Sequence, residues 1–295
     1  MLASLRNVAA CAAGAACLVL GAAQAETVGH YHIFPTPSYI AKTGRAPHLR
    51  AGAMEYFGGS VFESSKVVSV LWGPNVNSTI VSTIPDFTTA LVNSTYVDQM
   101  AQYNTHLKGV NGHKGTKQDI GRGTFLGQIQ IKPKHTSSSI TDEDIQDELA
   151  YQIKKGKLPP QDLNTLYMIY FPDTVTITLD GLTSCFDFGA YHFANHDTKL
   201  SKKNIFYAVE PDCDAGINFI TFAASHEFAE ATTDNVPTPG SNPDFPQAWN
   251  TSDGFEIADL CGSSGTLTAG SEHWTVTQYY LNSTGACSTG NYTSP

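Results

Sequence analysis

The chain has few basic residues. Its 295 residues contain 17 Lys and Arg against 27 Asp and Glu, which gives a formal charge of -10 at pH 7. The basic residues form no cluster, and this excludes the positive surface with which proteins bind nucleic acids or anionic membranes. Internal repeats and low-complexity segments are also absent, which excludes repeat architectures.

Long apolar runs are absent after residue 25. The first 25 residues carry one charge, Arg6, then an apolar stretch and an Ala-x-Ala end, a pattern typical of a secretory signal peptide cleaved before Glu26. No later run reaches the roughly 18 apolar residues that a membrane span needs. We therefore expect a secreted protein, extracellular or periplasmic, with no membrane span.

Cysteine is scarce, and no two cysteines form the Cys-x-x-Cys pair that is typical of zinc sites. Four of the six follow the predicted signal peptide. In an oxidising compartment an even number predicts two disulfides. Of the three possible connectivities we expect the nearest-neighbour pairing, which joins Cys185 to Cys213 and Cys261 to Cys287.

The remaining sequence alternates between strand-like and helical patterns. Residues 26–60 are rich in Gly, Pro and His and predict an irregular arm or short pro-segment, followed by a single domain over 61–295. A buried strand is predicted at 66–73, an edge or hairpin strand at 123–132, and further strands at 166–172, 175–181 and 204–210. Helices are predicted within 78–103, broken at Pro85, and over 141–156, which opens with a capping box. The order predicts an α+β fold with a mixed β-sheet covered by helices and a loop-rich C-terminal part.

The segment "AASHEFAEATTD", residues 223–234, contains His-Glu-x-x-Glu. If 217–233 is helical, His226 and Glu230 lie one turn apart on one face, where two ligands can converge on a zinc ion about 2.0 to 2.2 Å away. Glu227 lies beside them, so it is placed to act as general base. The alternative is an ordinary amphipathic helix on which these three residues form a solvated polar stripe. The segment "GFEIADLCG" favours the metal site, because Glu256 and Asp259 stand among apolar residues and need a partner there.

These motifs resemble the thermolysin-like zinc peptidases in "HEFAEATTD" and "EIAD". The resemblance implies a zincin-like fold with His226 and Glu256 as metal ligands and Glu227 as general base. Asp234 and Asp259 correspond to the carboxylates that support the ligands. Glu230 stands where that family has its second histidine.

A longer stretch, residues 66–288, resembles the phosphate-induced or Exordium-like secreted proteins of plants and bacteria. The similar segments include "VSVLWG", "YMIYFPDTVTITLDGLTSCFDFGAYHF", "SHEFAEATTD", "EIADLC" and "TVTQYYLNSTGAC". That family also has His-Glu-x-x-Glu. The resemblance implies export and a shared fold, and it implies no particular activity.

Other histidines are candidates for the same site. His192 in "GAYHF" is a predicted extra ligand or oxyanion donor, with a structural histidine beneath a loop as the alternative. His273 is a predicted donor of a transition-state hydrogen bond, although its neighbours Tyr279 and Tyr280 also suit a strand core. His30 and His32 form an H-x-H arm. The chain has no G-x-S-x-G elbow, which excludes that class of serine hydrolase.

The sequence therefore predicts a zinc-dependent metallohydrolase, a peptidase, with zinc held by His226, Glu230 and Glu256 and with Glu227 as base. The predicted partner is a peptide or protein substrate, and the predicted state is a monomer. The alternative is a non-catalytic protein that binds a cell-wall or matrix glycan and holds a structural ion. Calcium or another divalent ion would suit that role because hard oxygens bind it.

Overall fold

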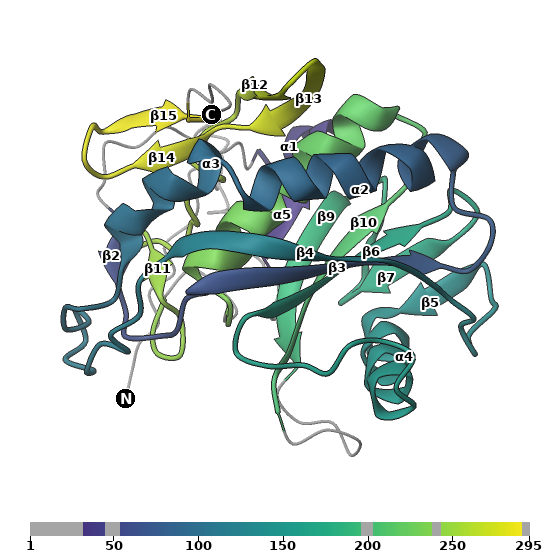
Figure 1. The fold of residues 1–295 in the computed structure, drawn as a ribbon, viewed down its shortest axis with the longest axis horizontal. Helices are drawn as coiled ribbons and strands as arrows, with labels where there is room; N and C mark the ends of the chain where they lie inside the picture. The colour runs from purple at the N-terminus through teal and green to yellow at the C-terminus, as the bar shows by residue number, and fades with distance from the viewer. Residues whose placement is uncertain (1–31, 45–53, 196–202, 238–242, 291–295) are drawn as a thin grey trace, which may run out of the picture.

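The computed structural model describes residues 32–44, 54–195, 203–237 and 243–290. The predicted signal peptide and His30 lie outside these residues. A mixed six-stranded sheet forms the centre of the fold, in the order β1-β9-β10-β6-β3-β4 (Figure 1). The strands are β1 (His32–Pro35), β3 (Ser64–Trp72), β4 (Gly121–Ile131), β6 (Thr165–Phe171), β9 (Phe188–Asn195) and β10 (Ile205–Pro211). The α+β class is confirmed.

The central strands are parallel and buried on both faces. β3 pairs with β4 and β6, and β6 pairs with β10, all in parallel, whereas β9 and β1 add antiparallel pairs at one edge. Every residue of β6 and β10 is buried. Strands covered on both faces need continuous apolar runs, which explains why their sequences do not alternate. The strand predicted at 123–132 lies at the other edge, as β4.

Helices cover the two faces of this sheet differently. α2 (Ser78–Val92) and α5 (Ile217–Thr233) pack on one face, where their apolar residues join one core cluster. α4 (Asp142–Lys154) lies on the opposite face with a second core cluster and with the small sheet of β5 (Ser139–Thr141), β7 (Thr176–Leu179) and β8 (Leu182–Thr183) (Figure 1). The predicted capping box at Thr141 and Asp144 begins α4. We call these two sides of the sheet the α5 face and the α4 face.

The predicted break at Pro85 is wrong, because α2 continues through it. Proline lacks an N–H, so the carbonyl of Val81, four residues earlier, loses its helical donor. Gln128 on β4 replaces that donor, since its Nε2 donates to Val81 O at 3.0 Å. A side chain from the sheet thus satisfies the group that the proline leaves open.

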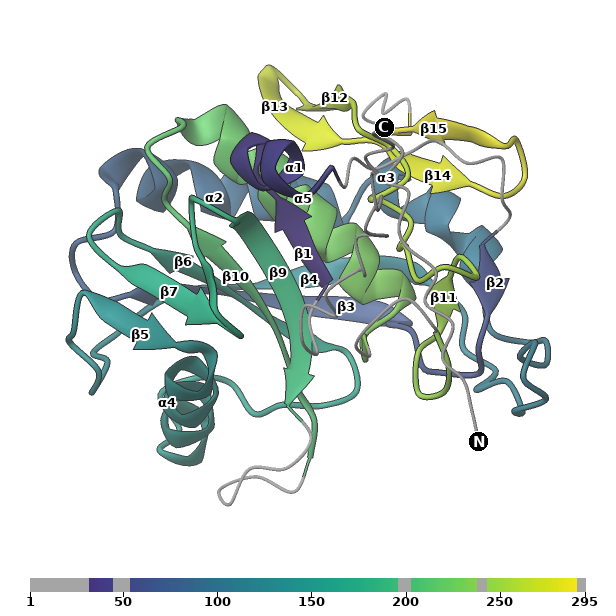
Figure 2. The ribbon, with the colours of Figure 1, turned by 180° about the vertical axis from the view of Figure 1, so that it is seen from behind.

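The arm predicted as irregular is partly ordered. β1 pairs antiparallel with β9, with His32 opposite His192, and α1 (Pro37–Thr43) follows it. Thr36 caps α1 by accepting from Tyr39 N, and proline at the first helical position suits a helix start. β2 (Glu55–Tyr56) then pairs with β11 (Trp249–Asn250). Figure 2 shows β1 beside β9 and α5. β1 has only four residues, which is too short for an alternating hydrophobic pattern to be recognised in the sequence.

The C-terminal part contains more strand than predicted. β12 (Ser264–Ala269) and β13 (Glu272–Thr277) form one antiparallel pair, and β14 (Tyr279–Leu281) and β15 (Ala286–Ser288) form another. α3 (Thr95–Asp98) and a 3-10 helix (Gln99–Tyr103) lie near them. Both predicted disulfides are present, Cys185–Cys213 and Cys261–Cys287. No helix among the described residues is long and apolar enough to cross a membrane.

Candidate metal centre

α5 carries the His-Glu-x-x-Glu motif into the interior. The helix follows Gly216 and spans 217–233, as predicted. His226, Glu227 and Glu230 are 3%, 0% and 2% exposed. The solvated polar stripe of the alternative interpretation is therefore wrong. Charged side chains at such depth need partners, because burial in a medium of low dielectric is costly for an unpaired charge.

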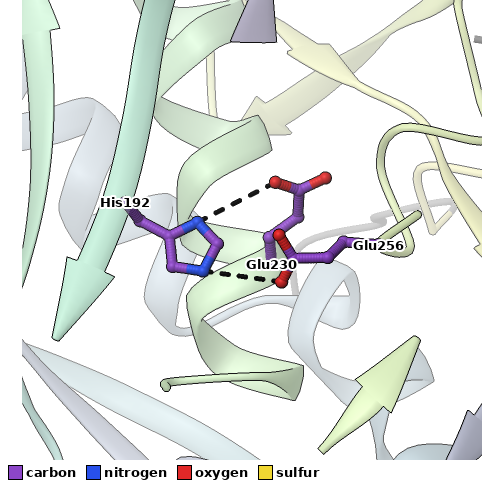
Figure 3. Close-up of side chains that lie close together, drawn as sticks. All are labelled: His192, Glu230 and Glu256. Atoms are coloured by element: carbon purple, nitrogen blue, oxygen red, sulfur yellow. Dashed lines mark ion pairs between the residues drawn. The ribbon is translucent and has the colours of Figure 1, made fainter. Parts of the chain in front are cut away.

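Two strands and a C-terminal segment bring further acidic and imidazole groups to α5. His192 comes from β9 and is 1% exposed, and its two ring nitrogens face the carboxylates of Glu230 and Glu256 (Figure 3). Its Nδ1 is 3.1 Å from Glu227 Oε2, and its Nε2 is 3.5 Å from Glu256 Oε1. The structure thus brings His192 into the cluster formed by the predicted site residues.

Glu230 is the common member of two potential metal-binding groups. One consists of His192, Glu230 and Glu256, and the other of His226, Glu227 and Glu230. In each, one ligand atom per residue lies within 4.8 Å of the others. The two Glu230 oxygens face different imidazoles: Oε1 is 3.0 Å from His226 Nε2, and Oε2 is 3.9 Å from His192 Nδ1. The predicted ligands are thus divided between the two groups, with Glu256 on the His192 side.

The segment after β11 is folded back onto Glu230. Asp259 N donates to Glu230 Oε1 at 3.1 Å, and Glu256 N donates to Asp259 Oδ2 at 3.1 Å. Asp259 Oδ1 is 3.7 Å from His226 Nε2. The Cys261–Cys287 disulfide follows directly and ties this segment to β15. These two backbone bonds hold the 256–259 segment and the Asp259 carboxylate against Glu230.

Asp234 supports the site from the end of α5. Its N–H donates to Glu230 O at 2.7 Å, and its carboxylate accepts from Ala248 N at 2.9 Å and from Asn250 Nδ2 at 2.5 Å. These bonds tie the helix end to the segment that leads to Glu256. Asp234 thus joins the end of α5 to the 248–250 segment, which agrees with the supporting role predicted for it.

Some polar atoms of the cluster have no hydrogen-bond partner among the described residues. They include His226 Nε2, Glu227 Oε1 and both oxygens of Glu210, a fully buried residue of β10. His226 Nε2 is close to Glu230 Oε1 but makes no aligned hydrogen bond with it. Buried polar groups in native proteins are nearly always satisfied, so unpaired atoms here need an explanation. A divalent ion between nitrogen and carboxylate donors supplies one, and the donor types suit zinc.

The hydrogen bonds of His192 assign a proton to Glu227. Nε2 is 3.1 Å from Asp234 O, a carbonyl that only accepts, so Nε2 carries the hydrogen of a neutral ring. Burial lowers the pKa of His192, which favours this neutral ring. Nδ1 then accepts, and Glu227 Oε2 must donate to it. Burial raises the pKa of Glu227 to about 8, in agreement with a protonated carboxyl.

Burial also raises the pKa values of the other acids. Burial and the charge of Asp259 raise the pKa of Glu230 to about 7, and burial raises the pKa of Asp234 to about 7. Burial is also the main cause that raises the pKa values of Glu210 and Glu256 well above their usual range. Burial opposes protonation of His226, but the charge of Glu230 and its neighbours raises the pKa of that imidazole well above its usual range. A divalent ion reverses this pattern by favouring ionised carboxylates and neutral imidazoles.

One predicted residue and one that was not predicted need separate comment. The structure does not bring His273 into the cluster: its ring is exposed on β13, and its Nδ1 is 2.9 Å from Thr268 Oγ1. Its neighbours Tyr279 and Tyr280 are buried in β14, as the strand-core alternative predicted. Glu210 is a residue of this region that the sequence patterns did not predict. The available signal was an acidic residue at the end of an otherwise apolar strand, "NIFYAVE".

No protein-family model, no curated protein and no solved structure matched this chain.

Proposed function

We propose that the protein is a secreted, zinc-dependent metallohydrolase that acts on peptides and has the zincin-like fold implied by its resemblance to the thermolysin-like peptidases. The observation that carries this proposal is the buried cluster itself. Among the described residues, only His192 and His226 form ion pairs with Glu227 and Glu230. His192 is held neutral, and the single charge of a protonated His226 cannot balance both carboxylates when they ionise, whereas a bound divalent ion can.

The donors for this ion are His226 Nε2 and Glu230 Oε1, which lie 3.0 Å apart, together with a carboxylate from the 256–259 segment. Glu256 is the third ligand predicted from the sequence. Asp259 is the carboxylate that faces His226, at 3.7 Å from Nε2. Its side chain is 15% exposed, against 4% or less for His226 and Glu230. Asp259 is therefore on the side of the cluster nearest to solvent.

Glu227 is suited to move a proton. When bound, zinc supplies a Lewis acid that polarises a carbonyl and acidifies water. Glu227 Oε2 is held by His192 Nδ1 at 3.1 Å, which leaves Oε1 without a partner among the described residues. In peptide hydrolysis Glu227 would take a proton from the attacking water and give it to the leaving nitrogen as the C–N bond breaks.

A second candidate function is a non-catalytic protein with a structural ion. It is favoured by the depth of the cluster, because Glu227 and Glu256 are 0% exposed and His192 is 1% exposed. A structural ion needs no access for substrate, whereas a catalytic ion keeps an open position. In that case the partner would be a cell-wall or matrix glycan, and calcium would be an alternative ion.

The test is metal analysis of the purified protein, combined with a digest of casein or mixed peptides with and without a chelator. We expect bound zinc, and cleavage that the chelator abolishes. Glu230→Ala should lose metal and cleavage together, whereas the control His273→Ala should keep both. Bound metal without cleavage across a broad peptide library would favour the structural ion. Absence of any bound divalent ion would contradict both candidates.

A further inference from the structure

The α5 cluster has more donors than one ion uses. A zinc ion takes three or four protein ligands. The described cluster contains two imidazoles and four carboxylates, all of which are linked by the ion pairs and hydrogen bonds around Glu230: His192, His226, Glu227, Glu230, Glu256 and Asp259.

The two oxygens of Glu230 divide the cluster. Oε1 faces His226 Nε2 at 3.0 Å and accepts from the Asp259 N–H at 3.1 Å, whereas Oε2 is 3.9 Å from His192 Nδ1. One ligand atom each of His192, Glu230 and Glu256 lies within 4.8 Å of the others. Glu256 lies on the His192 side, with Oε1 3.5 Å from Nε2. Two donors that share a tetrahedral ion at about 2.1 Å lie about 3.4 Å apart. The separation of His192 Nε2 and Glu256 Oε1 is close to this value.

The environment of His192 is that of a metal ligand. A histidine that binds a metal through one ring nitrogen usually has its other nitrogen held by a carboxylate or a carbonyl. Glu227 Oε2 holds Nδ1 at 3.1 Å, so Nε2 is the nitrogen turned toward Glu256 and Asp234 O. Metal binding at Nε2 would release the proton that Nε2 donates to Asp234 O, and the proton of Glu227 would move to Nδ1, so that the hydrogen bond to Glu227 is kept with Nδ1 as the donor.

We propose a second zinc site, formed by His192, Glu230 and Glu256, which shares the Glu230 carboxylate with the zinc site at His226. This inference rests on the metal site proposed above and adds a second ion to it. One site lies at His226 and Asp259, on the more exposed side, and the second is fully buried. Glu230 bridges the two sites, and Glu227 orients His192 through the hydrogen bond between Oε2 and Nδ1.

The test is zinc stoichiometry by native mass spectrometry and elemental analysis of the full disulfide-bonded protein, dialysed against zinc and then against metal-free buffer. We expect two zinc ions per chain in the wild type. His192→Ala and Glu256→Gln should each hold one, His226→Ala should also hold one, and Glu230→Ala should hold none. His273→Ala is the matched control, because it removes an imidazole outside the cluster, and it should hold two.

A second measurement does not depend on the folding of variants. Cobalt bound at both sites of the wild type should show magnetic coupling by electron paramagnetic resonance, since the Glu230 carboxylate joins the two ions. One zinc per chain in the wild type, retained in His192→Ala, would overturn the second site and leave the proposed function standing. No zinc in the wild type would overturn both. Two uncoupled ions, unaffected by Glu230→Ala, would overturn the shared carboxylate.

Discussion

The two faces of the central sheet bury carboxylates in opposite ways. On the α4 face, Asp142 is 1% exposed and accepts from Tyr191 Oη at 2.6 Å and from Tyr207 Oη at 2.8 Å. On the α5 face, Glu227 Oε1 and both oxygens of Glu210 have no hydrogen-bond partner among the described residues. Burial of an acid is thus not by itself the mark of a site. The two faces differ in whether neutral hydrogen-bond donors, such as tyrosine hydroxyls, lie next to the buried acid.

The same strands serve both faces. Tyr191 and His192 are neighbours on β9, and Tyr207 and Glu210 lie three residues apart on β10. Successive side chains on a strand point to opposite faces of the sheet. Each strand therefore directs a tyrosine toward Asp142 on the α4 face, and β9 directs an imidazole and β10 a carboxylate toward α5. The α4 face is a completed hydrogen-bond network. On the α5 face the acid oxygens named above lack a hydrogen-bond donor among the described residues, and a bound cation would satisfy them.

The largest expected effect concerns Glu227. Glu227→Gln should lower peptide hydrolysis by about 10²-fold to 10⁴-fold, because the amide cannot carry a proton, while zinc content and fold are retained. The measurement is the rate of casein or peptide cleavage beside elemental analysis. Glu148→Gln is a buried control on the α4 face and should cleave like the wild type. If Glu227→Gln cleaves as well as the wild type, Glu227 is not the base.

Zinc should stabilise the protein through the α5 face alone. At free zinc about 1,000 times its dissociation constant, the free energy of unfolding should rise by about 4 kcal/mol. Thermal unfolding with zinc and with a chelator measures the shift. Asp142→Asn should show the same shift as the wild type, and Glu230→Ala should show none. An equal shift in Glu230→Ala would place the ion elsewhere.

Asp142→Ala should destabilise the protein by about 2 to 4 kcal/mol, because two buried tyrosine hydroxyls lose their acceptor. Urea denaturation with and without zinc should give the same loss. Tyr207→Phe removes only one donor and should cost about 1 kcal/mol. A loss from Asp142→Ala that depends on zinc would show that the two faces are coupled.

The stability of the metal-free protein should fall as pH rises. Burial raises the folded-state pKa values of Glu227 to about 8 and of Glu230 to about 7, whereas in the unfolded chain these groups titrate near 4.5. Between those values the folded state binds more protons, so the free energy of unfolding decreases with pH. His192, whose pKa is lowered, opposes this trend only at acid pH, where the unfolded imidazole takes up a proton.

We therefore expect the melting temperature of chelator-treated protein to fall by at least about 10 °C between pH 5 and pH 8. Saturating zinc should remove this fall, since the ion keeps the carboxylates ionised in the folded state. Calorimetry at several pH values measures both curves. A metal-free protein that is most stable at pH 8 would contradict burial of these acids.

The smallest expected effect is a gain in the stability of the metal-free protein. Glu210→Met should stabilise the metal-free protein by about 1 kcal/mol, because it replaces a buried acid whose oxygens have no hydrogen-bond partner among the described residues by an apolar side chain of similar length. The measurement is urea denaturation in the presence of a chelator. The matched change on the α4 face, Glu148→Met, should destabilise, since Glu148 accepts from Lys134 N and Gln152 Nε2. Destabilisation by Glu210→Met would indicate that this acid is satisfied.

Local patterns in the sequence determined several features that the structure bears out. The spacing of the motif residues predicted α5 over 217–233, and the capping box at Thr141 and Asp144 predicted α4. The nearest-neighbour cysteine pairing was also correct. These features depend on residues within a few helical turns or on a few cysteines, so one sequence contains the information they need.

The tertiary structure alone decided how the site is composed. His192 and Glu210 reach α5 from β9 and β10, and the folding of 256–259 onto Glu230 places Glu256 beside one imidazole and Asp259 beside the other. Contacts between strands, a helix and a distant loop depend on strand order and register, which local periodicity does not specify. The continuation of α2 through Pro85 has the same origin, because a side chain on another strand supplies the donor that the local sequence lacks.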